Sequence, residues 1–417
     1  MDFLQELMDS TAELESPRSF FWWAGLTAVS AVVMDNVWLS RGEQEGSNSN
    51  FYNLYPNIYV MLHADSAMKK GPPVNLIKDL VKKASNGLPK IISGRSSIQG
   101  MLKLLGTAQS QPGGKILNKS AGFIASSEFT SSIVEDRAAM TILTDLYDRN
   151  WNDGEWKSLL KMEEFSLKDP ILTLLAAINE AHFDDFIGAK DVHGGFMGRM
   201  FVIAESQTAN FNPLINKLQR VPDRQKLVEH LHAVSKLRGP FKSLAGTPQG
   251  KYYHEWYMDF YQNIRSQKVK DETGTLGRFG DSVLKIALCI SLSRSLELEI
   301  DMTTMQQAIE VSEKLITNVR KTTLGKKGKA ENLYLKTLIM QELLTREPHS
   351  ITRENLMKKC FMHYSSVDEF NEVIGVFLEV GMLVVENRGS IMLYTMPDSQ
   401  VKALNDHVAG KKSMGGA

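Results

Sequence analysis

The sequence has few cysteines, no net charge and no long uninterrupted apolar run. Its 417 residues include two cysteines, Cys289 and Cys360, which are too few for a disulfide framework or a cysteine-based zinc site. Both thiols lie in apolar helical patterns, as expected in a reducing cytoplasm, so we expect a cytoplasmic protein. Lys plus Arg equals Asp plus Glu at 48 each, so any surface that attracts nucleic acid has to be local. The histidines lack the spacing of a zinc site, and we predict no bound zinc.

The N-terminal region carries neither a secretory signal nor a membrane span. It begins MDFLQELMDSTAELESP, which is acidic where a secretory signal would be basic. The most apolar stretch, residues 20–34, is 15 residues long and is interrupted by Thr27 and Ser30. Because a membrane span needs about 20 apolar residues, this stretch predicts a buried core helix and no membrane partner.

The middle of the chain alternates between short apolar runs and amphipathic segments. The composition, with 43% hydrophobic and 23% charged residues, is that of a globular protein. Strands are predicted at 54–63, 90–93, 121–126, 171–178 and 200–204, and helices between them. This alternation predicts the α/β class, with a mostly parallel sheet covered on both faces.

Composition divides the chain into six predicted segments. They are an N-terminal helical segment (1–50), an α/β core (51–212), a helical lid subdomain (213–319), a basic linker (320–330), a C-terminal domain (331–397) and a tail expected to be disordered (398–417). In the C-terminal domain we expect helices at 331–345, 353–361 and 366–380, followed by strands at 382–386 and 391–395. Three helices and a hairpin in this order predict a winged helix.

A candidate phosphate-binding loop follows the first predicted strand of the core. In the pattern G-x-x-x-x-G-K-[ST], Lys70 takes the lysine position, Ala64 and Lys69 replace the two glycines, and Gly71 replaces the Mg²⁺-binding hydroxyl. The context of strand, loop and helix favours phosphate binding, since the following helix N-terminus attracts anions. The alternative is an ordinary loop with surface lysines. The candidate nucleotide-binding residues are Ala64, Asp65, Ser66, Ala67, Met68, Lys69, Lys70 and Gly71.

Two polar residues end later strands of the same predicted sheet. Glu128 stands where an acid that orients water or metal is needed, although Ser127 precedes it in place of the usual Asp. Asn179 ends the next strand, where a residue that senses the terminal phosphate would lie. Each could instead cap a helix, and only their joint placement at strand ends favours a site.

Five segments within residues 15–300 resemble an uncharacterised, largely prophage- and plasmid-borne family of P-loop ATPases. They are SPRSFFWWAGLTAVSAVV at 16–33, LYPNIYVMLHADSAMKK at 54–70, GFIASSEFTSSI at 122–133, HGGFMGRMFVIAE at 193–205 and LGRFGDSVLKIALCISL at 276–292. Members of that family look like RecA/AAA+-type replicative helicases and often accompany primases. The resemblance implies a RecA/AAA+-like core that binds ATP and Mg²⁺.

The resemblance also implies roles for two arginines. Arg199 would be a finger that reaches a neighbouring subunit's nucleotide; the alternative is a salt bridge to Asp184 or Asp185. Arg278 would be a sensor in its own subunit, and the alternative is a surface arginine.

The function implied is a DNA-dependent ATPase, a ring-forming helicase-like motor that acts on single-stranded DNA beside a primase. A hexamer is one candidate assembly for the ring. A second hypothesis is a non-hydrolysing helicase loader or initiator, because the loop lacks its glycines and its hydroxyl. A third is a transcription regulator that uses the winged helix.

Candidate DNA contacts lie outside the third helix of the C-terminal domain. That helix carries Asp368, Glu369, Glu372 and Glu379 and no Lys or Arg, so it would repel phosphate. Docking to protein is therefore as good an explanation of this domain as DNA binding. The positive candidates are Lys326, Lys327 and Lys329 in the linker, Arg388 on the wing, Lys358 and Lys359 on the preceding helix, and Lys190 to His193 in a pore loop.

Overall fold

The chain forms two compact units in the computed structural model. The first unit comprises Met1–Phe260 and Lys270–Leu315, and the second comprises Tyr261–Val269 and Ile316–Ala417. The structure describes residues 1–42, 52–94, 96–110, 116–129, 137–148, 154–160, 163–179, 182–183, 195–211, 223–266, 274–323, 330–364, 366–388 and 391–402.

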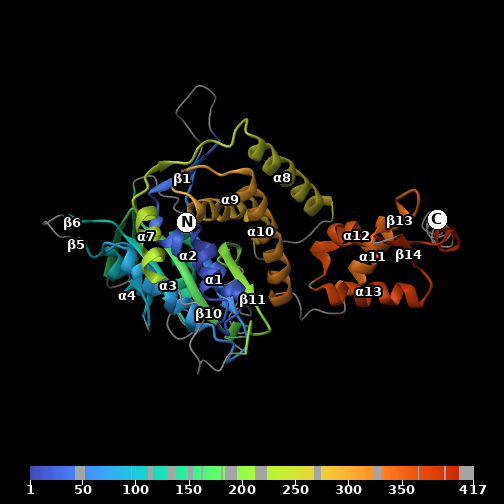
Figure 1. Cartoon of the computed structure of the whole chain (residues 1–417), viewed down its shortest axis with the longest axis horizontal. Helices are drawn as coiled ribbons and strands as arrows, with labels where there is room; N and C mark the ends of the chain where they lie inside the picture. Colours follow the sequence, from blue (N-terminus) through green and yellow to red (C-terminus); the bar gives the residue numbers. More distant parts are fainter. Residues whose placement is uncertain are drawn as a thin grey trace. The chain divides into compact units, whose positions relative to one another are not determined.

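A five-stranded, all-parallel sheet organises the first unit (Figure 1). The strand order is β11-β3-β10-β7-β4. Three of the strands, β3, β7 and β10, are buried along their whole length, as their continuous apolar sequences require. The predicted α/β class with a parallel sheet is therefore confirmed. The strands are β3 (Tyr59–His63), β4 (Lys90–Ile92), β7 (Ala121–Ser126), β10 (Ile171–Ile178) and β11 (Met200–Ala204).

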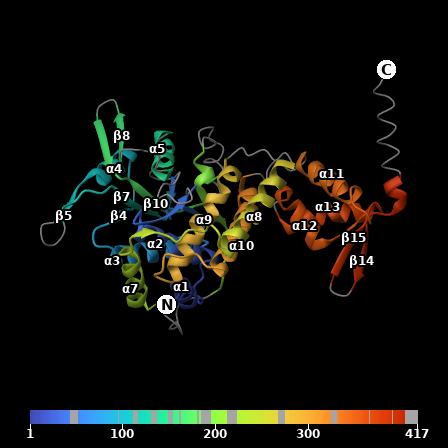
Figure 2. The ribbon, with the colours of Figure 1, turned by 90° about the horizontal axis from the view of Figure 1, so that it is seen from above.

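Helices cover both faces of this sheet (Figure 2). On one face, α2 (Arg18–Val33) packs against α3 (Gly71–Ala84) and α7 (Arg224–Ser235). On the other face lie α4 (Ile98–Gly106) and α5 (Arg137–Asp148), and α5 packs on β10.

The apolar helix α2 lies at the centre of the first unit. It is hydrophobic on all sides and almost entirely buried, as such a helix must be. Two polar residues tie it to the sheet: Ser30 Oγ lies 2.9 Å from Thr173 Oγ1 and accepts a hydrogen bond from Ile58 N at 3.2 Å. Among the described helices, none is long and apolar enough to cross a membrane.

The first unit contains further helices and strands, and the last residues of α8 and α10 belong to the second unit. Helices α7 and α9 pack against α2, so most of the predicted lid belongs to the same compact unit as the sheet. The helices are α1 (Phe3–Ser10), α8 (Pro248–Ser266), α9 (Thr275–Arg294), α10 (Met302–Thr323) and the 3-10 helix η3 (Met197–Arg199). The strands are β1 (Val37–Arg41), β2 (Tyr52–Leu54), β5 (Gln109–Ser110), β6 (Ile116–Leu117), β8 (Glu155–Leu160), β9 (Glu163–Lys168) and β12 (Gly239–Pro240).

The structure differs from the predicted elements at several places. The N-terminal segment predicted to be helical contains the strand β1, and the short strands β5, β6 and β12 were not predicted either. The single strand predicted at 54–63 is divided: β2 pairs with β1 in a separate sheet, and β3 begins only at Tyr59. Pro56 lies between them, and a proline cannot donate a ladder hydrogen bond. The antiparallel hairpin of β8 and β9 was not predicted, because the alternation of Phe165 and Leu167 in β9 is short and stands among charged residues.

Among its described residues, the second unit contains the helices α11 to α13, a helical stretch at 398–402 and a three-stranded antiparallel sheet of order β13-β15-β14. The tail predicted to be disordered from residue 398 therefore begins as a helix, and Val401 packs into the apolar core of this unit. Residues such as Leu335, Leu356 and Phe370 form its own apolar core. The predicted helices and hairpin are present, and β13 is an additional strand. The elements are α11 (Ala330–Leu344), β13 (Ser350–Thr352), α12 (Arg353–Cys360), η4 (Phe361–His363), α13 (Val367–Glu379), β14 (Val384–Arg388) and β15 (Ile391–Thr395).

A buried lysine links α9 to the start of β3. Lys285 Nζ donates to Asn57 Oδ1 at 2.7 Å and to Asn57 O at 3.1 Å, and lies 3.8 Å from the centre of the Tyr147 ring. Burial lowers the pKa of Lys285 from 10.5 to about 7, although Asp148 and Asp281 oppose this shift. The unfolded chain therefore binds one more proton than the folded chain between these two pH values.

We expect Lys285 to make the free energy of unfolding rise with pH between about 7 and 10.5. The slope from one such group is at most about 1.4 kcal/mol per pH unit. Lys285→Met should remove this slope, as measured by urea denaturation at pH 7, 8, 9 and 10. Lys314→Met, at an exposed lysine paired with Glu310, should keep it. An unchanged slope in Lys285→Met would contradict the burial argument.

Candidate functional site

The chain reverses its direction across the sheet between β3 and β10. From β3 the chain runs through α3 to β4, the edge strand on the far side of β10 and β7. From β10 it runs in the opposite direction, past β3, to the other edge strand, β11. Parallel sheets bind ligands in the crevice at such a point, outside the carboxyl ends of the strands. The candidate phosphate loop follows β3 at this crevice.

Lys70 closes the loop that joins β3 to α3. Its ammonium group donates to Ala64 O and to Asp65 O, each at 2.6 Å, and so joins the last residue of the loop to its first two. A lysine ammonium has three N–H donors, so one remains for a ligand. Burial lowers the pKa of Lys70, and the nearby Asp65 opposes this effect.

The backbone of the loop is left-handed at two residues that are not glycine. Ala67 has φ 70° and Lys69, which replaces the second glycine of the motif, has φ 51°. This conformation costs roughly 1–2 kcal/mol per residue with a side chain. The N-terminal segment holds the strained region: Ser16 Oγ donates to Lys69 O at 2.7 Å, and Glu15 lies 3.5 Å from the Lys69 ammonium.

Helix α3 begins at Gly71, directly after the loop. Pro72 and Pro73 occupy its first turn, where proline is favoured, and no acidic residue lies there. Pro72 and Pro73 have no backbone N–H, so Gly71 and Val74 are the residues of this turn that can donate to an anion. The helix dipole at this end also favours an anion. The loop, Lys70 and the start of α3 therefore form a site suited to phosphate.

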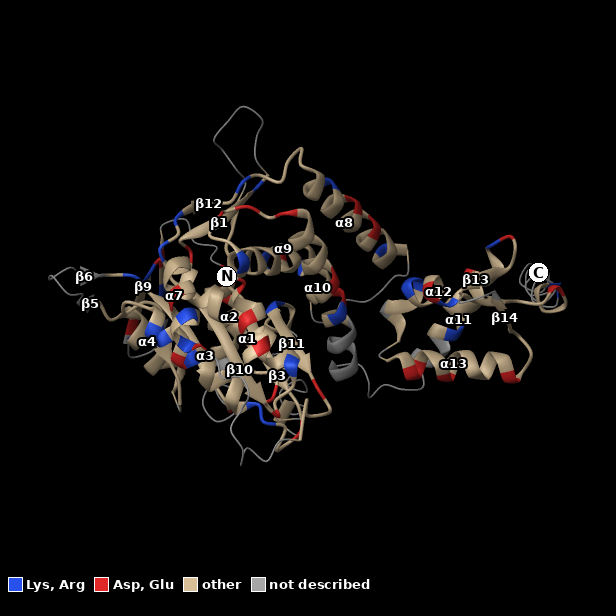
Figure 3. Ribbon diagram, in the orientation of Figure 1, with Lys and Arg blue, Asp and Glu red and all other residues tan. Residues whose placement is uncertain are grey.

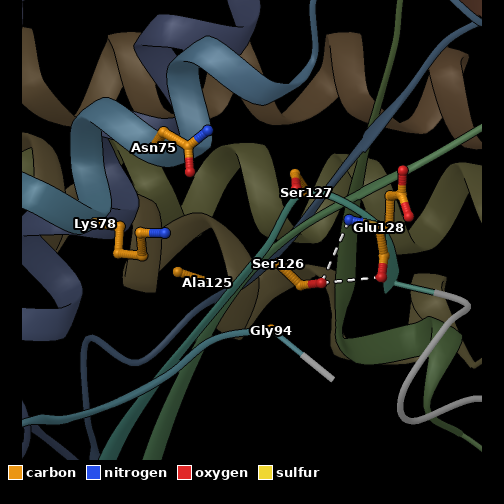
Figure 4. Close-up of a pocket in the computed structure, with 7 residues that line it drawn as sticks. All are labelled: Asn75, Lys78, Gly94, Ala125, Ser126, Ser127 and Glu128. Carbon is orange, nitrogen blue, oxygen red and sulfur yellow. Dashed lines mark hydrogen bonds between the residues drawn. The ribbon is translucent and has the colours of Figure 1, made fainter. Parts of the chain in front are cut away.

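A pocket of about 330 Å³ lies beside this site (Figure 4). Helix α3, the end of β4 and the end of β7 supply its walls. Because β10 lies between β3 and β7, and strands are about 4.8 Å apart, the ends of β3 and β7 are separated by about 10 Å. The lining residues are Asn75, Lys78, Gly94, Ala125, Ser126, Ser127 and Glu128.

Of the two polar residues predicted at strand ends, Glu128 lines the pocket and Asn179 does not. Ser126 Oγ accepts a hydrogen bond from Glu128 N at 3.4 Å and donates to Glu128 O at 3.0 Å, which fixes the turn that carries the acid. Asn179 Oδ1 accepts from His182 N at 2.9 Å, the geometry of a helix cap.

Arg199 is buried in an ion pair within its own chain. Its Nε donates to Asp148 Oδ1 at 2.7 Å and its Nη2 to Asp148 Oδ2. A Cβ atom at Gly195, which has φ +102°, would lie 2.9 Å from Arg199 Nη1, so the arginine needs glycine there. The observed partner is Asp148; the alternatives Asp184 and Asp185 lie outside the described residues.

The two arginines lie at the other end of the sheet from Lys70 and Glu128. Arg199 precedes β11, and Met200 pairs with Tyr59 at the start of β3. Arg278 is exposed, donates to Gly274 O at 3.3 Å and lies near Gly195. Lys70 and Glu128 therefore lie at the carboxyl ends of the parallel strands, and the two arginines lie near the amino ends.

Most of the predicted DNA contacts fall outside the described residues: Lys190, His193, Lys326, Lys327 and Lys329. Arg388 is the last residue of β14. Sequence reasoning missed Asn75, Lys78 and Asp148. The first two share one polar face of α3, a pattern that also fits an ordinary surface.

No protein-family model matches this chain, and no curated protein gives a significant match. The resemblance to phage and plasmid ATPases therefore stays a prediction.

We expect Arg199→Met to destabilise the fold. It leaves Asp148 without its buried partner, and breaking such a pair costs about 3 kcal/mol. Arg278→Met, at an exposed arginine, should change the free energy of unfolding by less than about 0.5 kcal/mol. Urea denaturation of both variants measures the difference. If Arg199→Met is as stable as the wild type, the ion pair is not structural and the finger role gains support.

Proposed function

We propose that the chain is a DNA-dependent ATPase of the RecA/AAA+ type, a ring-forming helicase-like motor of a phage or other mobile element. In this proposal ATP lies on residues 64–71 with its phosphates at the N-terminus of α3. The observation that carries it is the Lys70 ammonium group, held 2.6 Å from Ala64 O and Asp65 O at the point where the chain reverses across the sheet. One of its N–H donors stays available to a phosphate oxygen.

The strand order is compatible with this assignment. A single strand, β10, lies between β3, which precedes the phosphate loop, and β7, which leads to Glu128. Glu128 at the end of β7 is then placed to orient a water molecule toward the terminal phosphate, and the five-segment resemblance agrees with this assignment.

The residues of this chain do not fit the Mg²⁺ site that the resemblance implies. Gly71 offers no hydroxyl, and Ser127 stands where an aspartate would hold the metal. Among the described residues that line the pocket, Glu128 is the single carboxylate, and Lys78 contributes an ammonium group. Mg²⁺ prefers carboxylates together with substrate phosphates, and a fixed cation in the pocket opposes a second one. We therefore assign no step to a protein-bound metal.

The second unit, which we propose to be a winged helix, is better suited to docking protein than to reading a DNA groove. Asp368, Glu372 and Glu379 are exposed along α13, which carries no Lys or Arg (Figure 3). Such a surface repels phosphate. Lys358 and Lys359 lie on α12 instead, and a primase or another replication protein is the proposed partner.

A second candidate is a nucleotide-binding loader or initiator that does not hydrolyse ATP. The observation that favours it is the pair of departures at Gly71 and Ser127, which remove the usual metal ligands but leave the phosphate loop closed. The two candidates share nucleotide binding and differ in turnover.

We expect the purified protein to hydrolyse ATP faster with single-stranded DNA than without it. Lys70→Ala should lower the DNA-stimulated rate by about 100-fold or more, because it removes a donor to the phosphates. Lys82→Ala, at an exposed lysine of the same helix, is the matched control and should keep the rate. ATP binding is measured in parallel.

The two measurements separate the candidates. If the wild type binds ATP but does not hydrolyse it, and Lys70→Ala loses ATP binding, the motor is contradicted and the non-hydrolysing loader is supported. Equal binding by the wild type and Lys70→Ala would remove the proposed nucleotide site.

A further inference from the structure

Two polar side chains that line the pocket beside the phosphate loop have no contact assigned to them in the proposed nucleotide site. Lys78 and Asn75 both come from α3 and both line the pocket. Figure 4 shows them on one side of it, with Ser127 and Glu128 across from them. The following inference rests on the proposed function.

Asn75 lies next to the position where the hydroxyl of the motif is missing. A Cβ atom at Gly71 would be 3.9 Å from Asn75 Nδ2. Residues 71, 75 and 78 follow at intervals of four and three, so they share one face of the helix. Side chains on a helix lean toward its N-terminus, which here is the end that follows the phosphate loop. The Cα–Cβ bonds of Asn75 and Lys78 therefore lean toward the end of α3 where the phosphates are proposed to lie.

Lys78 has no hydrogen bond or ion pair with the described part of the chain, and neither has the Asn75 amide. This differs from the neighbouring Lys83, whose ammonium lies 2.9 Å from Asp79 Oδ2. The Lys78 side chain is half-buried at the pocket wall. A half-buried cation with three free donors in a pocket at the carboxyl edge of the sheet is suited to an oxyanion.

We infer that Lys78 and Asn75 contact the terminal phosphate of a bound nucleoside triphosphate and replace the Mg²⁺ ion that a hydroxyl at position 71 would hold. Lys70 then contacts the phosphates from the loop, and Lys78 contacts them from the pocket. The two ammonium groups together neutralise much of the triphosphate charge. Nucleotide binding therefore depends only weakly on Mg²⁺.

The test is the affinity for ATP, measured by calorimetry with excess Mg²⁺ and again with EDTA. The wild type should change by less than about threefold between the two conditions. Lys78→Gln should lose about tenfold or more in EDTA, which is what one charge-assisted hydrogen bond supplies. Lys82→Gln makes the same charge change one turn further along α3, at an exposed lysine outside the pocket lining, and should behave as the wild type. Thermal melting checks that both variants are folded.

The outcomes separate this inference from the proposed function. If the wild type binds ATP with Mg²⁺ but not in EDTA, or if Lys78→Gln matches Lys82→Gln in EDTA, the inference is overturned while nucleotide binding stands. If the wild type binds ATP in neither condition, the proposed function fails and this inference fails with it. Asn75→Ala provides a second variant, with a smaller expected loss of about threefold in EDTA, because it removes a neutral donor.

Discussion

The position of β10 between β3 and β7 is the constraint on which the candidate site depends. It places the phosphate loop and Glu128 two strand spacings apart and puts the crevice at the end of β3. Because β10 is apolar on both faces, its hydrophobic pattern cannot fix its register. The hydrogen bond between Thr173 and Ser30 of α2 supplies a specific polar contact, and Ser30 also accepts a hydrogen bond from the backbone N–H of Ile58, just before β3. One buried serine thus bonds to both β10 and the residue that precedes β3.

The N-terminal segment also explains how the loop keeps its shape without glycine. In the usual motif, glycine adopts the left-handed backbone without strain. Here Lys69 adopts it, and contacts from Ser16 and Glu15 offset the cost. The same segment continues into α2, so the buried helix that aligns the strands also anchors the residues that hold the loop. The glycines are thus replaced by tertiary contacts from a part of the chain that precedes the sheet.

Sequence reasoning found the buried strands and most helices because continuous apolar runs and helical periodicity are local signals. It could not give the strand order, which depends on packing between distant segments. It predicted one strand across Pro56 where the structure has two, and it missed the β8–β9 hairpin, whose apolar alternation is short. In the site, Lys70 and Glu128 could be predicted because they follow the ends of predicted strands. Asn75 and Lys78 could not be predicted, because a polar helix face gives the same sequence pattern whether it lines a pocket or faces solvent.

The cationic side chains at the two ends of the parallel strands differ in whether they already have a partner. At the carboxyl edge, Lys78 is unpaired among the described residues and Lys70 retains a free donor, so both are available to a ligand. At the amino ends of the strands, Arg199 is paired with Asp148. Lys285 donates to Asn57 and lies over the Tyr147 ring. A residue that acts on a neighbouring subunit's nucleotide has to be exposed and remote from its own site. Arg278 meets both conditions and Arg199 meets only the second. In any ring of this chain, Arg278 is therefore the arginine of the two that can reach a neighbour without first breaking a buried ion pair.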